Sequence, residues 1–150
     1  MMTPAAVNIL VADPEPAICR HVCDFIEKMG HRAEAATTGD EVVRHLAAHE
    51  YCLLLLDADL RQGSGDPLDS WVTDRYPNTP VVIMSSAPSV RAVIAAMRRG
   101  VFDYIIKPYE ILELASIVPR AINWWTDRSQ NGRNDTAAAT APEQPIAAVD

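Results

Sequence analysis

A short apolar run that ends abruptly in carboxylates constrains this chain more than any other feature. Residues 51–56 are almost purely apolar, and Asp57 and Asp59 follow them directly. A run of this length, bounded by turn residues, is typical of a strand buried on both faces, and the nearby glycines favour a strand over a helical segment. Asp57 would then lie at the carboxyl edge of a sheet, where open α/β folds place their chemistry. On this stretch alone, a turn or helix-capping role for Asp57 is an equal alternative.

Further apolar runs divide the rest of the chain into similar units. Strands are predicted at residues 7–12, 51–56, 81–84 and 104–106, with a weak one at 32–36. Each strand is followed by a stretch of helical periodicity. The first of these helices ends at Gly30, and the second begins at the capping box Thr38–Glu41. The third and fourth cover about 67–76 and 90–99, and the fifth begins near residue 110. Such alternation predicts a doubly wound α/β fold, with a five-stranded parallel sheet, helices on both faces and right-handed crossovers.

Two of the predicted helices carry specific expectations. In the helix at 90–99, the large apolar side chains are expected to face the core; these are Val90, Val93, Ile94 and Met97. In the last helix, Pro119 is expected to kink the helix or end it early, because proline lacks the amide donor and clashes with the preceding turn. The composition of the chain also predicts where the ordered domain ends. The polar composition beyond residue 125 predicts an ordered domain at 1–125 and a disordered Ala- and Pro-rich tail at 126–150.

Composition bounds the class of protein. The chain has 150 residues and a formal net charge of -7, with no basic stripe of the kind that binds nucleic acid. Its start lacks the pattern of a signal peptide, and no apolar run approaches the length of a membrane helix. Three cysteines, each inside a predicted element, indicate reduced thiols rather than disulfides. We therefore expect a cytoplasmic protein.

Four polar side chains stand where predicted strands end, namely Asp13, Asp57, Ser85 and Lys107. Because the carboxyl ends of parallel strands share one edge of the sheet, these groups are expected to converge. An aspartate can attack phosphorus, a hard cation such as Mg²⁺ prefers carboxylate oxygens, and an ammonium pairs with phosphate. The set therefore indicates a phosphoryl site, although each residue alone has an ordinary structural role.

At these residues the chain resembles the receiver domain of bacterial two-component response regulators. The segments that carry the resemblance, over about residues 8–125, are NILVADPEPAI, LLLLDADL, PVVIMSSA and GVFDYIIKPYE. The resemblance implies a flavodoxin-like fold with strand order 2-1-3-4-5. It also implies a role for each matching residue: phosphoacceptor for Asp57, Mg²⁺ ligand for Asp13, backbone carbonyl ligand for Asp59, switch residues for Ser85 and Tyr104, phosphate partner for Lys107, and a cis Lys107–Pro108 bond.

The resemblance further implies a signalling protein rather than an enzyme. A sensor histidine kinase or a phosphotransfer protein would donate the phosphoryl group to Asp57. The surface formed by the fourth helix, the fifth strand and the fifth helix would then change shape for a downstream protein partner, or for a second copy of the chain in a homodimer. No segment is suited to binding DNA directly.

Two alternative functions remain: one follows from a departure from the receiver pattern, and the other from a resemblance to a second family. The family usually carries two adjacent acids after the first strand, but here Pro14 follows Asp13 and the next acid is Glu15. Weakened Mg²⁺ binding would favour a phosphorylation-independent binding module, unless Glu15 reaches the metal. More distantly, DADL resembles the nucleophile motif of haloacid-dehalogenase-type phosphatases, which need an acidic pair after the lysine; only Glu110 and Glu113 follow here.

Overall fold

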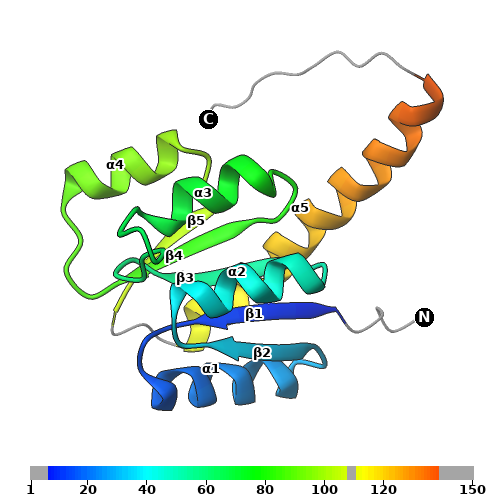
Figure 1. Ribbon diagram of the computed structural model, residues 1–150. Coiled ribbons are helices and arrows are strands. Elements are labelled where there is room, and N and C mark those ends of the chain that lie inside the picture. Colours follow the sequence, from blue (N-terminus) through cyan, green and yellow to red (C-terminus); the bar gives the residue numbers. More distant parts are fainter. Residues whose placement is uncertain (1–6, 108–110, 139–150) are drawn as a thin grey trace.

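The structure is a computed structural model that describes residues 7–107 and 111–138. Five parallel strands form one sheet in the order β2-β1-β3-β4-β5, and helices cover both faces (Figure 1). The strands are β1 (Asn8–Ala12), β2 (Arg32–Ala36), β3 (Leu53–Asp57), β4 (Val81–Ser85) and β5 (Asp103–Ile106). The helices are α1 (Pro16–Lys28), α2 (Gly39–Ala48), α3 (Leu68–Arg75), α4 (Val90–Arg98) and α5 (Ile111–Ala138). The predicted fold class and strand order are confirmed.

The leucine run forms β3, the central strand of the sheet, and all of its side chains are buried. Leu53 and Leu55 pack into the layer that α1 and α5 cover, whereas Leu54 and Leu56 pack into the layer under α2, α3 and α4. This alternation follows from the two-residue period of a strand. Each fully buried leucine contributes about 2 kcal/mol of apolar transfer free energy. The register of β3 therefore places Asp57 firmly at the middle of the sheet's carboxyl edge.

The ends of α2 and its neighbours follow the local signals in the sequence. The Thr38 hydroxyl accepts a hydrogen bond from the Glu41 amide at 3.1 Å, as a capping box requires. The Glu41 carboxylate reaches back to the amide of Thr37 at 2.7 Å, one residue before the cap. Gly30, which ends the first helical unit, has a φ of 97°, a conformation that favours glycine.

The last helix differs from the prediction, because Pro119 lies inside α5 and does not end it. Beyond the proline, Trp125 packs against the core, and the Trp124 ring lies between Phe102, 5.9 Å away, and the Arg128 guanidinium, 4.4 Å away. These contacts offset the hydrogen bond that proline cannot donate. The helix continues to Ala138, so the predicted boundary at residue 125 does not mark its end. Residues 139–150 of the predicted tail lie outside the described residues.

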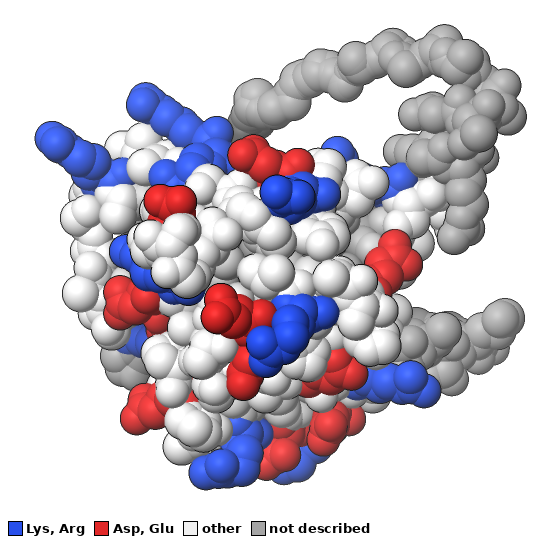
Figure 2. Space-filling model, in the orientation of Figure 1, with Lys and Arg blue, Asp and Glu red and all other residues white. Residues whose placement is uncertain are grey.

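The fourth helix also differs from the prediction. Val90, Ile94 and Met97 are exposed, at 77%, 45% and 46%, and Ala96 is the α4 side chain that enters the core. Helical periodicity correctly identified an apolar stripe on α4 but assigned it to the wrong side. The corner over α4 is also where basic side chains predominate in Figure 2, whereas acidic and basic residues are interspersed over the rest of that face.

Within the described ranges, no helix combines the length and hydropathy that crossing a membrane requires.

The loop that follows Asp57 is held against the start of α2 at Gly39. A Cβ atom on Gly39 would lie 1.9 Å from the carbonyl oxygen of Arg61. We expect Gly39→Ala to lower the free energy of unfolding by about 2 kcal/mol, because the backbone must move to accommodate the methyl group. Urea denaturation measures this difference. Gly63→Ala is the matched control, since its Cβ would have an ordinary contact of 3.5 Å; equal stability of the two variants would contradict the expectation.

Candidate phosphoacceptor site

Three of the predicted site residues meet directly at the carboxyl edge of the sheet. Asp13 follows β1, Asp57 is the last residue of β3, and Lys107 follows β5. The Lys107 ammonium lies 2.5 Å from Oδ2 of Asp13 and 2.5 Å from Oδ2 of Asp57. Both carboxylates are buried, with 1% and 6% of their residue surface exposed. The lysine therefore reaches across the end of β4 and joins two carboxylates that would otherwise repel each other.

Backbone amides bind the remaining carboxylate oxygens. Oδ1 of Asp13 accepts a hydrogen bond from the Glu15 amide at 2.9 Å, and Oδ1 of Asp57 accepts one from the Asp59 amide at 2.8 Å. All four oxygens thus have a donor, and the side chains are held in one orientation. Two carboxylates and one ammonium leave the buried centre with a formal charge of -1, which suits it to attract a cation.

The protonation of Lys107 follows from its neighbours. Burial alone lowers the pKa of this lysine, but the hydrogen bonds and charges of Asp13 and Asp57 outweigh burial and raise the pKa above its ordinary value. Lys107 is consequently an ammonium at neutral pH, as a partner for a phosphoryl group must be.

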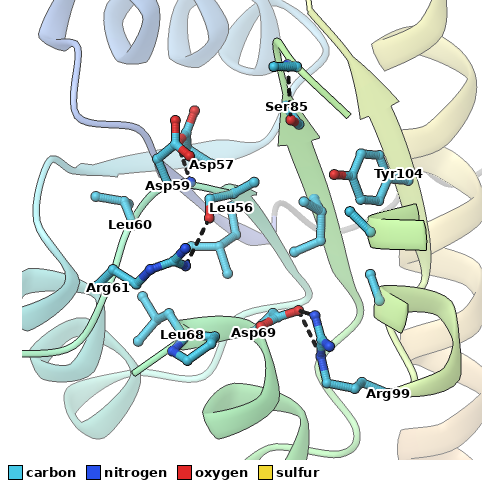
Figure 3. Close-up of a pocket in the computed structure, with 16 residues that line it drawn as sticks. Leu56, Asp57, Asp59, Leu60, Arg61, Leu68, Asp69, Ser85, Arg99 and Tyr104 are labelled. Carbon is cyan, nitrogen blue, oxygen red and sulfur yellow. Dashed lines mark hydrogen bonds and ion pairs between the residues drawn. The ribbon is translucent and has the colours of Figure 1, made fainter. Parts of the chain in front are cut away.

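The predicted switch residues line a cavity of about 280 Å³ beside the carboxylates. Asp57, Asp59 and Ser85 lie at one end of this cavity, and Tyr104 lies on its β5 side with its hydroxyl pointing inward (Figure 3). The Ser85 hydroxyl accepts a hydrogen bond from the Ala87 amide at 3.3 Å. The structure therefore places Ser85 and Tyr104 around one open space next to Asp57.

Two charged residues that the sequence did not single out complete the wall of this cavity. Asp69 in α3 and Arg99 at the end of α4 form an ion pair at the end of the cavity opposite Ser85 (Figure 3). They are 30 residues apart, and neither belongs to a motif. Their pairing carries no signal in a single sequence.

The groups that could hold Mg²⁺ are the carboxylates of Asp13 and Asp57, together with the Asp59 backbone carbonyl that the family resemblance implies. Pro14 and Glu15 are both exposed, and the Glu15 contact with Asp13 is made by its backbone. Among the described residues, no three His, Cys, Asp or Glu side chains are placed together as a metal site. Because Mg²⁺ is commonly held by one or two carboxylates and several waters, this donor set fits the ion, with fewer charges than an acid at position 14 would provide.

The buried thiol of Cys19 contacts the backbone of Asp13. Cys19 Sγ lies 3.4 Å from the carbonyl oxygen of Asp13, and burial raises the pKa of this thiol. It therefore acts as a neutral donor. Three further residues that the sequence analysis named lie elsewhere: Pro108 and Glu110 fall outside the described residues, and Glu113 is exposed on α5.

Fold and site together define a doubly wound α/β domain with a buried Asp–Lys–Asp centre at the carboxyl edge of its sheet. The family model for the response regulator receiver domain matches residues 9–119. The chain belongs to this family.

Individual relatives agree with this assignment. The nitrogen assimilation regulatory protein NtrX of Azorhizobium caulinodans is 32% identical over 119 residues, which cover 78% of this chain and 26% of NtrX. The response regulator protein FleR of Pseudomonas aeruginosa is 28% identical over 115 residues, which cover 77% of this chain and 24% of FleR. The chain thus spans about a quarter of the length of these curated relatives.

Solved structures share the fold. NtrX from Brucella abortus, in complex with ADP, superposes with a TM-score of 0.79 at 25% identity, covering 93% of this chain and 31% of that one. A CheY-like receiver domain protein from Methanospirillum hungatei gives a TM-score of 0.75 at 19% identity, covering 83% of this chain and 99% of that one.

The Asp–Lys–Asp centre makes a prediction about stability. Lys107→Met leaves two buried carboxylates without their shared cation, so we expect the free energy of unfolding at pH 7 to fall by about 3 kcal/mol. Because the folded protein raises the pKa of Lys107, the loss should stay constant up to the ordinary lysine pKa of about 10.4 and shrink as pH rises further.

Urea denaturation between pH 7 and pH 11 tests this dependence. Lys28→Met removes the same charge from the exposed end of α1 and serves as the control. Equal losses in the two variants would show that the buried centre gains nothing from Lys107.

Proposed function

We propose that this receiver domain accepts a phosphoryl group on Asp57 from the phosphohistidine of a sensor kinase or phosphotransfer protein. The observation that carries the proposal is the Lys107 ammonium beside the buried Asp57 carboxylate at the sheet edge. A carboxylate oxygen of Asp57 would bond to phosphorus as the phosphorus–nitrogen bond breaks, and the departing imidazole would keep the nitrogen electron pair.

Neighbouring residues have separate roles in this proposal. Lys107 would stay paired with the phosphoryl oxygens as a fixed positive charge. Asp13, Asp57 and the Asp59 carbonyl would hold Mg²⁺, which when bound neutralises negative charge on the phosphoryl group. The domain is a signalling module, so turnover would be limited to taking up the phosphoryl group and losing it to water.

The readout of phosphorylation would pass through the cavity to α4. Ser85 would turn toward the new phosphoryl oxygens, and Tyr104 would occupy more of the cavity beside it. Helix α4 carries basic side chains, and the exposed large hydrophobic residues lie on α4, β5 and the first turn of α5: Val90, Ile94, Met97, Ile106 and Leu112. Such a patch fits a downstream protein partner or a second copy of the chain.

A phosphorylation-independent binding module is the second candidate function. Pro14 supplies no carboxylate, and Lys107 already satisfies one oxygen of each buried aspartate. In this candidate the same apolar surface would bind its partner without any change at Asp57.

Labelling of the wild-type chain by acetyl phosphate separates the two functions, and Asp57→Asn tests whether Asp57 carries the label. We expect the variant to lose phosphoryl uptake from acetyl phosphate entirely, because the amide cannot form an acyl phosphate. Mass spectrometry measures the change as the loss of the mass increment that one added phosphoryl group would give. Asp59→Asn is the matched control, since the proposed contribution of Asp59 comes from its backbone; labelling of the Asp57→Asn variant would overturn the assignment.

Pro14→Asp restores the missing acid and tests why Mg²⁺ binding should be weak. An added carboxylate raises the charge of the site, so we expect the Mg²⁺ dissociation constant to fall by about tenfold. Titration followed by Trp fluorescence or NMR measures it. Pro14→Asn is the neutral control, and equal affinity of the two variants would show that position 14 does not govern the metal site.

A further inference from the structure

The far end of the cavity beside Asp57 is lined by an ion pair that joins two helices, the buried Asp69 of α3 and the partly exposed Arg99 at the end of α4. Oδ2 of Asp69 accepts a hydrogen bond from Arg99 Nε at 3.0 Å and a second one from the same guanidinium. The other oxygen, Oδ1, accepts the amide of Ser70 at 2.9 Å. The Asp69 side chain is 10% exposed and that of Arg99 is 39% exposed. The pair is therefore a directed contact between α3 and α4 in which the carboxylate is buried and the guanidinium stays partly exposed.

The ion pair matters for α4 because this helix has few other attachments to the core. Ala96 is its buried side chain, whereas Val90, Ile94 and Met97 point largely into solvent. An element with little buried apolar surface is held weakly and opens at low free energy. Arg99 caps the carboxyl end of α4, so its bond to Asp69 ties that end to α3.

The same pair borders the space next to the phosphoacceptor. Asp57, Ser85 and Tyr104 share the cavity with Asp69 and Arg99, and Ala92 and Ala96 form its α4 wall (Figure 3). An inward movement of Tyr104 would bring its ring toward α4. A shift of α4 across this space would have to break the bond between Arg99 and Asp69.

We propose that the Asp69–Arg99 ion pair is a positioning contact that holds α4 in the arrangement described here and thereby opposes the change that accompanies phosphoryl uptake on Asp57. The inference rests on the proposed function and adds a residue-level restraint to it. A contact made in one of two arrangements biases their populations, and its removal raises the apparent affinity of any ligand that favours the other arrangement.

The test uses the neutral pair D69N/R99Q, which removes both charges together and so leaves no buried charge unpaired. Arg98→Gln is the control for losing an arginine at this end of α4, because Arg98 is the exposed neighbour of Arg99; the double variant itself leaves the net charge unchanged. Beryllofluoride with Mg²⁺ serves as the acyl phosphate mimic. We expect D69N/R99Q to bind it about fivefold more tightly than the wild-type chain, and Arg98→Gln to bind it as the wild-type chain does.

Amide hydrogen exchange provides the second readout. Exchange over residues 90–98 should rise in D69N/R99Q while exchange in the five strands stays unchanged; a merely structural role would raise both and leave beryllofluoride affinity at the wild-type value. Affinity equal to that of Arg98→Gln, or weaker, overturns the inference even if the variant is less stable.

The wild-type chain distinguishes failure of this inference from failure of the proposed function. If the wild-type chain gives no beryllofluoride response, phosphoryl uptake on Asp57 is wrong and the restraint on it falls as well. If the wild-type chain responds and the neutral pair does not bind more tightly, only the role of Asp69 and Arg99 is wrong.

Discussion

The contact on which this structure depends is the Lys107 ammonium held between two buried carboxylates. Burying Asp13 and Asp57 side by side is costly unless a cation offsets their charge. The sheet makes the offset possible, because its order puts β1 and β3 side by side and lets a lysine at the end of β5 reach both. The backbone amides of Glu15 and Asp59 then fix the carboxylates from the other side. The strand order thus brings together the two carboxylates and the cation that balances their charge.

The two faces of the sheet are packed to different degrees. The face under α1 and α5 is continuous, and its contacts hold α5 together across Pro119 and as far as Trp125. On the other face, α4 presents alanines to a cavity and its larger apolar side chains to solvent. This asymmetry is what the proposed function needs, because a change at α4 would then leave the rest of the sheet folded.

The site has one carboxylate fewer than the family usually carries, and this affects how strongly it attracts Mg²⁺. The centre holds Asp57, the proposed phosphoacceptor, beside the Lys107 ammonium. Pro14 removes a carboxylate from the place nearest to them, and Glu15 turns its backbone rather than its side chain toward Asp13. Fewer negative charges mean less attraction for a divalent cation.

The sequence by itself determined the sheet, the strand order implied by family resemblance, and the convergence of Asp13, Asp57 and Lys107. These follow from local rules, since apolar runs define buried strands and parallel strands end at one edge. Only the tertiary structure decided the rest. Periodicity shows that α4 has an apolar stripe but not which side faces the sheet, because that depends on what the rest of the chain leaves uncovered. Proline weakens a helix locally, yet contacts made by Trp124 and Trp125 carry α5 past it. The pairing of Asp69 with Arg99 joins positions 30 residues apart, and nothing short of the folded chain brings them together.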